Sequence, residues 1–125
     1  MLPKAHKLSS SADFRQTMRS GARAGSRTVV VHLRARTETA IIGGPRFGLV
    51  VSKQVGNAVA RHSLSRKLRH VCFAARGDLD RSYDIVVRAL PPAAAATCAE
   101  LADDVSSCID RARRKLPVTP GPELR

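Results

Sequence analysis

Apolar residues recur along the chain in runs that predict β-strands. Runs of β-branched and aliphatic residues predict strands over 28–34, 47–52 and 84–90, with a possible shorter strand over 40–42. A turn-rich stretch containing Gly43, Gly44 and Pro45 follows the first of them. We therefore expect the strands over 28–34 and 47–52 to pair as antiparallel neighbours.

Three other segments have the spacing of amphipathic helices. Ser10 and Asp13 have the S-x-x-D spacing of a capping box, so a short helix is expected from Ser10 to the residue before Gly21. Asn57 is a good N-cap for a second helix. On a 3.6-residue period this helix has one apolar stripe, made of Ala60, Leu64, Leu68, Val71 and Ala75. A third helix over 94–115 has an apolar face made of Cys98, Leu101, Val105, Cys108 and Ile109.

These elements predict one α+β domain. The chain has 125 residues, of which 43% are hydrophobic, enough for a single core and too many for a disordered chain. The segment 117–125 has three prolines and no periodicity, so we expect a domain over 1–116 and a disordered tail after it. Because no apolar run is long enough to span a bilayer and no apolar signal segment is visible, we expect a cytoplasmic protein.

Charge is distributed unevenly along the chain. Lys and Arg number 22 against 10 Asp and Glu, a formal net charge of +12. Residues 1–77 carry 15 basic and 2 acidic side chains, whereas residues 78–125 carry 7 basic and 8 acidic ones. Nearly all the excess therefore lies in the first two-thirds. Such segregation favours a polyanionic partner, above all nucleic acid, over a generally basic composition.

Few residues have the pattern of an active site. The three cysteines lack metal-ligand or redox spacing and are expected to be small buried hydrophobes. The sequence has no G-x-S-x-G elbow, no phosphate loop and no cluster of acids for metal-dependent cleavage. We therefore expect no catalytic residue and no metal site in the protein, and a protein nuclease is disfavoured.

Two segments are candidates for binding nucleic acid. The turn over 52–57 leads into a helix N-terminus, which favours a phosphate, although an ordinary strand-to-helix turn has the same sequence. The following helix carries a basic face without acids, suited to phosphate contacts and made of Arg61, Ser65, Arg69 and Arg76, with His62 and Arg66 beside it. Phe14 and Met18 share a helix face and are either core or a stacking platform for unpaired bases. The platform favours RNA over duplex DNA.

The segment 46–61, RFGLVVSKQVGNAVAR, resembles the bacterial ribonuclease P protein subunit. The resemblance covers roughly residues 7–110, including Asp13, Phe14, Arg15 and Gly21. It implies an α–β sandwich of order αβββαβα with a left-handed βαβ crossover, similar to the second domain of ribosomal protein S5. It also implies a protein that assists a catalytic RNA in removing 5′ leaders from precursor tRNA, with magnesium bound chiefly by the RNA. The implied partners are ribonuclease P RNA, in a 1:1 complex with a monomeric protein, and precursor tRNA.

The resemblance also assigns residues to two binding roles. Docking on the catalytic RNA falls to Lys53, Gly56, Asn57, Arg61, His62, Ser65, Arg66 and Arg69. The cleft for the single-stranded leader falls to Phe14, Met18, Val31, Arg46 and Ser52. The sequence departs from the family at Gln54, Ser63 and Ser65, where basic residues are usual, and at His62, where asparagine is usual. The alternative is a general RNA-binding or ribosome-associated basic protein.

Overall fold

The computed structural model describes residues 4–37 and 44–116. The described helices are α1 (Ser11–Ser20), α2 (Ala58–Ala75) and α3 (Cys98–Arg114), with single-turn helices at Lys4–His6, Lys53–Val55, Arg76–Asp78 and Pro91–Ala95. The described strands are β1 (Ala22–Gly25), β2 (Val29–Ala35), β3 (Arg46–Val50) and β4 (Tyr83–Ala89). The order αβββαβα and the α+β class are confirmed.

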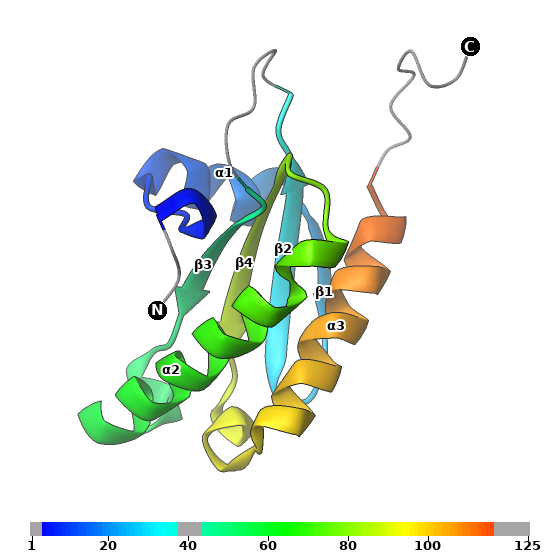
Figure 1. Cartoon of the computed structure of the whole chain (residues 1–125). Coiled ribbons are helices and arrows are strands. Elements are labelled where there is room, and N and C mark those ends of the chain that lie inside the picture. The colour runs from blue at the N-terminus through cyan, green and yellow to red at the C-terminus, as the bar shows by residue number, and fades with distance from the viewer. Residues whose placement is uncertain (1–3, 38–43, 117–125) are drawn as a thin grey trace.

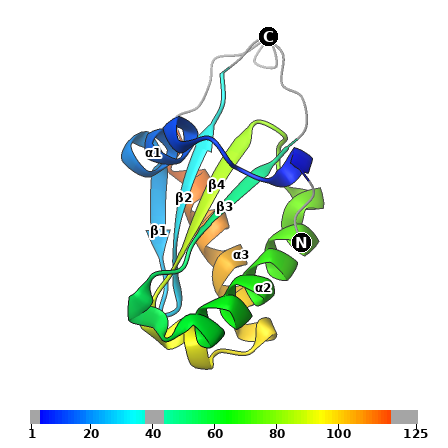
Figure 2. The ribbon, with the colours of Figure 1, turned by 90° about the vertical axis from the view of Figure 1, so that its left-hand side faces the viewer.

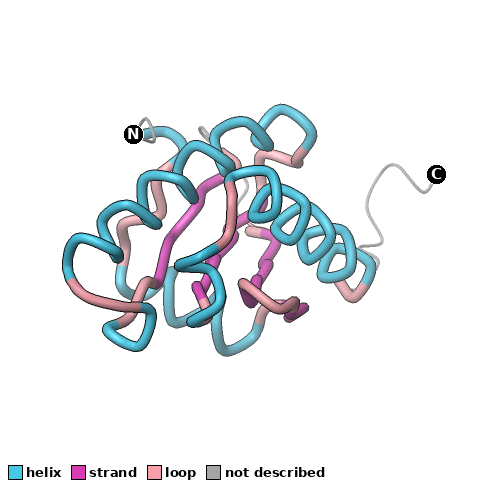
Figure 3. Tube along the Cα trace, turned by 90° about the horizontal axis from the view of Figure 1, so that it is seen from below, coloured by secondary structure: helices cyan, strands magenta, loops and turns pink. Residues whose placement is uncertain are grey.

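One sheet of order β1-β2-β4-β3 forms the middle layer of the molecule. Helices α2 and α3 cover one face and α1 covers part of the other (Figures 1 and 2). Seen from below, helices lie on both sides of the strands (Figure 3). The two faces of the sheet are therefore covered by different helices.

The expected antiparallel pairing of the strands over 28–34 and 47–52, which are β2 and β3, is wrong. β2 pairs antiparallel with β1 and with β4, whereas β3 pairs parallel with β4 at the sheet edge. β4 follows α2 in the chain yet lies between β2 and β3. The two strands are therefore not neighbours and do not form the expected hairpin. With α2 in front and both strands pointing down, β4 lies to the right of β3 (Figure 1), so the β3-α2-β4 crossover is left-handed.

Local capping signals fixed the starts of two helices correctly. The Ser10 side chain accepts a hydrogen bond from the Asp13 N–H, and Asn57 Oδ1 accepts one from the Ala60 N–H at 2.9 Å. α3 begins at Cys98 and not near residue 94, because Thr97 and Glu100 form a reciprocal capping box. As the first residue of α3, Cys98 is exposed, contrary to the expectation that all three cysteines are buried.

Strand β1 was not expected, because Ala22–Gly25 has neither β-branched nor aromatic residues. The possible strand over 40–42 and the tail over 117–125 lie outside the described residues. Within the described part of the chain, no helix is both long and apolar enough to cross a membrane.

The hydrophobic core lies between the sheet and the pair α2 and α3. From the sheet it takes alternate residues, Ala24, Val29, Val31, Leu33, Phe47, Ile85, Val87 and Ala89. From the helices it takes Leu64, Leu68, Val71, Cys72, Leu101, Val105, Cys108, Ile109 and Ala112. Because strand side chains alternate between faces, the intervening residues point towards α1, and these make the surface described next.

Candidate nucleic-acid interface

The α1 side of the sheet presents three cross-strand rows, defined by the pairing register. The upper row, near the start of β4, consists of Arg34, Asp84 and Arg46. The middle row consists of Arg23, His32, Val86 and Gly48. The lower row consists of Gly25, Val30, Arg88 and Val50. Basic side chains therefore occur in every row of this face.

Val31 is not part of this surface. Its side chain is fully buried in the core on the α2 and α3 side, so its expected place in the leader cleft is wrong. His32, one residue later, faces α1 instead. An error of one residue reverses the face because strand side chains alternate with a period of two.

The upper row is a network of arginines around two carboxylates. Asp84 is completely buried and accepts hydrogen bonds from Arg34 Nη2 at 2.6 Å and from Arg46 Nε and Nη2 at 2.7 Å. Arg36 Nε lies 3.5 Å from the Asp84 carboxylate. The hydrogen bonds of Arg46 to Asp84 and the nearby Asp84 charge raise the pKa of Arg46, whereas burial lowers it.

The same network fastens α1 to the sheet. Asp13 of α1 accepts hydrogen bonds from Arg34 Nη2 at 3.3 Å and Arg46 Nη2 at 3.2 Å. Both carboxylates hold the guanidinium of Arg46, the residue that we expected at the rim of the leader cleft. Arg46 therefore positions α1 through its bond to Asp13.

Phe14 lies directly over the sheet at Gly48. A Cβ atom on Gly48 would lie 2.2 Å from Phe14 Cζ, so only glycine lets the ring approach the strand this closely. Phe14 is half-buried and Met18 is 36% exposed. Both side chains are thus partly exposed, so neither is a buried core residue and both are accessible to a ligand.

A pocket of about 550 Å³ opens beside Phe14, between the N-terminal segment, β3 and α2. Its lining residues are Lys7, Leu8, Phe14, Phe47, Gly48, Leu49, His62 and Arg69. The apolar wall comes from α1 and β3, and the cationic wall comes from α2 and Lys7. An aromatic ring beside cations is suited to an unpaired base and its phosphate.

The turn before α2 has a backbone that requires glycine. Gly56 has φ 157°, and a Cβ there would meet the Ala60 side chain at 3.0 Å. Ser52 and Lys53 are exposed on this turn, and Asn57 caps the helix that follows. The conformation is thus the expected strand-to-helix turn, with its polar side chains facing solvent.

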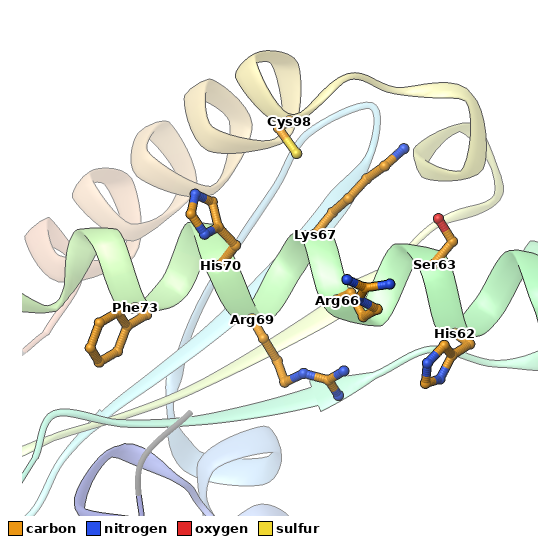
Figure 4. Close-up of a pocket in the computed structure, with 8 residues that line it drawn as sticks. All are labelled: His62, Ser63, Arg66, Lys67, Arg69, His70, Phe73 and Cys98. Carbon is orange, nitrogen blue, oxygen red and sulfur yellow. The ribbon is translucent and has the colours of Figure 1, made fainter. Parts of the chain in front are cut away.

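The cationic face of α2 surrounds a second pocket, of about 700 Å³. Figure 4 shows Ser63, Lys67 and His70 pointing towards Cys98 of α3, whereas His62, Arg69 and Phe73 point to the other side. Arg66 lies between the two groups. His62 and Arg69 line both pockets, so the two form one continuous cationic surface.

The expected docking residues differ in solvent exposure and in their contacts within the protein. His62 and Arg66 are exposed, and Ser65 and Arg69 are half-buried. Arg61 is half-buried, and its Nε donates to the Val51 carbonyl at 3.3 Å. Arg76, on the same stripe, stacks over the Phe73 ring at 3.5 Å, which ties it to the end of the helix.

Several residues of this surface were not among the predicted site residues. Lys67 and His70 lie one helical stripe away from the predicted arginines and are brought into the site by the packing of α3 beside α2. Arg23 and Arg88 come from strands, where a lone basic residue has no periodic signal. Their alternation with buried residues was the only usable sign.

Comparison with known proteins decides the family. The family model described as Ribonuclease P matches residues 2–113. The chain belongs to this family. It is 55% identical over 118 residues to the ribonuclease P protein component of Corynebacterium diphtheriae, covering 92% of this chain and 99% of that protein. It is 43% identical over 139 residues to the component from Nocardia farcinica, covering 97% and 86%.

Solved structures agree with the ribonuclease P fold. The RNase P protein of Staphylococcus aureus has a TM-score of 0.73 and 27% identity, covering 88% of this chain and 97% of its own. The Thermotoga maritima RNase P protein, at 20% identity, has a TM-score of 0.69, with 90% and 99% covered. The resemblance seen in the segment 46–61 is thereby confirmed.

The described part of this ribonuclease P family chain has no group of three or more His, Cys, Asp or Glu residues placed to hold a metal ion. Its titratable side chains on the α1 face are mainly engaged with one another or cationic. The excess of cationic side chains makes this surface suited to contacts with anions.

Proposed function

We propose that this chain is the protein component of ribonuclease P and that it binds both the catalytic RNA and the single-stranded 5′ leader of precursor tRNA. The observation that carries the proposal is the continuity of two pockets. His62 and Arg69 border the aromatic groove at Phe14 and also the cationic pocket between α2 and α3. One strand of RNA in the groove would thus lie beside a second RNA on α2.

The leader occupies the groove in this proposal. Phe14 and Met18 provide apolar surface for an unpaired base, and Lys7 and Arg69 provide charge for its phosphates. Ser52 and Lys53 are exposed in the turn between β3 and α2. Removal of the leader then forms the mature 5′ end of the tRNA.

The catalytic RNA docks on α2 in this proposal. No acidic residue occurs between Thr39 and Gly77, so the helix attracts phosphates without internal competition. Gln54, Ser63 and Ser65 lack the usual charge, but Lys67 and His70 line the same pocket as Ser63. Lys67 and His70 support the view that basic residues on the neighbouring stripe of α2 replace the usual ones at Ser63 and Ser65.

Cleavage itself is assigned to the RNA, with magnesium held there. In this proposal no residue of the protein acts as nucleophile, acid or base. Its contribution is to hold the leader and to screen phosphate repulsion between two RNAs, which favours substrate binding. We place the complex in the cytoplasm with one protein per catalytic RNA.

Reconstitution tests the proposal. The purified chain is mixed with its cognate ribonuclease P RNA and a leader-bearing precursor tRNA at low magnesium concentration. We expect the protein to stimulate cleavage and cleavage to require the RNA. Cleavage by the protein alone would favour a nuclease, and tight binding to unrelated RNAs without stimulation would favour a general RNA-binding protein.

Matched arginine variants refine the test. Arg66→Gln removes an exposed charge from α2, and Arg114→Gln removes an exposed charge from the C-terminal end of α3, outside both RNA-binding pockets. Arg66→Gln is expected to weaken binding to the catalytic RNA and to reduce the slope of log affinity against log salt by about one. Equal slopes for the two variants would remove Arg66 from the docking face.

A further inference from the structure

We infer that the catalytic RNA docks on the first turn of α3 as well as on α2, and that it contacts Cys98 together with Lys67 and His70. This inference rests on the proposed function, because the partner is the same RNA. It goes beyond that function by adding a second helix to the interface. The basic residues that are usual at Ser63 and Ser65 are absent, so the cations that face α3 take a larger share of the docking.

The pocket of about 700 Å³ has walls from both helices. Residues of α2 form most of its lining, and Cys98 is the lining residue from α3. Lys67 and His70 point towards Cys98 (Figure 4). His70 and Cys98 are exposed, so both are accessible to a ligand from solvent. Because no acidic side chain is among the described lining residues, a phosphate in this pocket meets only basic and neutral groups.

Two arginines of α2 are engaged in contacts within the protein. Arg61 Nε donates to the Val51 carbonyl. Arg76 stacks over the Phe73 ring, and its Nη1 donates to the Phe73 carbonyl at 2.6 Å. Arg66, which lines the pocket between α2 and α3, is exposed and has no ion pair among the described residues. The charge of α2 that is open to a phosphate therefore lies partly in this pocket.

Lys67 connects α2 to the segment that leads into α3. Its Nζ donates to the Ala96 carbonyl at 3.4 Å. An ammonium group has three N–H donors, so two of them remain for a ligand. The contact holds the ammonium group at the junction of the two helices, in the same pocket as Cys98. A phosphate bound there would lie against both helices.

The acidic side chains of α3 lie outside this pocket. The Glu100 carboxylate accepts a hydrogen bond from the Thr97 N–H at 2.8 Å, as part of the cap of α3. Asp103 and Asp110 line a different pocket along the helix, together with Ser107. An RNA on α2 can therefore reach the first turn of α3 without meeting a carboxylate in the pocket. Farther along α3 the acidic side chains would repel it.

The position of Cys98 permits a test in the unmodified protein. Cys72 and Cys108 are buried, so iodoacetamide added to the folded protein should alkylate Cys98. At a catalytic RNA concentration of about ten times its Kd, we expect alkylation to slow about tenfold, because only unbound protein reacts. The control is the double variant Cys98→Ser and Ser107→Cys, whose thiol lies outside the pocket and should react equally fast with and without RNA.

Charge substitutions at the same position give a second measurement. Cys98→Asp places a negative charge in the pocket, and because an acid is favourable at a helix N-terminus, α3 should remain folded. We expect its affinity for the catalytic RNA to fall about tenfold. Ser107→Asp adds the same charge at an exposed position of α3 outside the pocket and should have a smaller effect. Lys67→Gln should reduce the slope of log affinity against log salt by about one.

The outcomes separate this inference from the proposed function. If the catalytic RNA binds but Cys98 is alkylated at the same rate in the complex, the RNA does not cover α3 and the inference is overturned. Equal losses of affinity in Cys98→Asp and Ser107→Asp would also overturn it, because net charge alone would then explain both. If the original protein does not bind the catalytic RNA at all, the proposed function fails.

Discussion

The two faces of the sheet are built from different kinds of residues although they share the same strands. The core residues on the face towards α2 and α3 are all apolar, and the largest of them are fully buried. The face towards α1 carries four arginines, a histidine and a buried aspartate. One face provides the stability of the fold, while the other combines structural ion pairs with side chains left free for a ligand.

The difference shows how a small protein accommodates many cations in a folded state. Arg34 and Arg46 are fixed by Asp84 and Asp13, and they hold α1 over the sheet. Arg23 and Arg88 have no such partner in the described structure. The same residue type is therefore ion-paired in the upper row and without an ion pair among the described residues in the rows below.

The largest effect is expected from Asp84→Asn, which removes the buried charge that holds three arginines. Breaking one side of a buried ion-pair network costs about 3–5 kcal/mol, so the free energy of unfolding should fall by about that amount. Denaturant unfolding measures it. Asp110→Asn is the control, because Asp110 pairs with Arg113 at an exposed site and should change stability by less than about 1 kcal/mol. Equal effects would mean that the upper row does not stabilise the fold.

A smaller effect on stability is expected from Gly48→Ala, which forces the Phe14 ring off the strand. Because that ring is half-buried and can shift, the free energy of unfolding should fall by about 1–2 kcal/mol. Affinity for leader-bearing substrate should fall as well, whereas affinity for the catalytic RNA persists. Gly77→Ala is the matched control, since a Cβ at Gly77 meets nothing within 4 Å. Unchanged leader affinity would show that Phe14 is only part of the core.

The smallest effect concerns His32 and pH. Burial, Arg88 and Arg23 lower the pKa of His32 below its ordinary value of 6.5 in the folded protein. The unfolded chain therefore takes up the proton first, and the free energy of unfolding should decrease as the pH falls below about 6.5. Chemical unfolding between pH 7.5 and 5.5 measures this decrease. It should be smaller in His32→Gln and retained in His70→Gln, an exposed histidine; the same slope in all three proteins would contradict it.

Much of the local structure was predictable because its causes are local. Ser10 and Asn57 cap their helices through bonds to residues three positions away, and the stripe of Leu64, Leu68 and Val71 is buried as its spacing predicts. The basic face of α2 was predictable for the same reason. The sequence of this helix contains no acidic residue.

The remaining features depend on contacts between distant residues. β4 separates β2 from β3, so the pairing of the strands could not follow from the turn between them. Val31 and His32 are adjacent, and only the packed sheet shows which of them faces α1. The network that joins Asp13, Arg34, Arg46 and Asp84 spans four elements and leaves no periodic trace in the sequence.

The sequence by itself determined the family, the starts of α1 and α2 and the excess of positive charge, because motifs, caps and composition are properties of neighbouring residues. The tertiary structure alone decided which cations are neutralised and which are free. Ion pairing falls off steeply with distance, so it depends on which strands become neighbours. That is why Arg46 is held by Asp84 and Asp13, whereas Arg88, on the same strand as Asp84, forms no ion pair with the described residues.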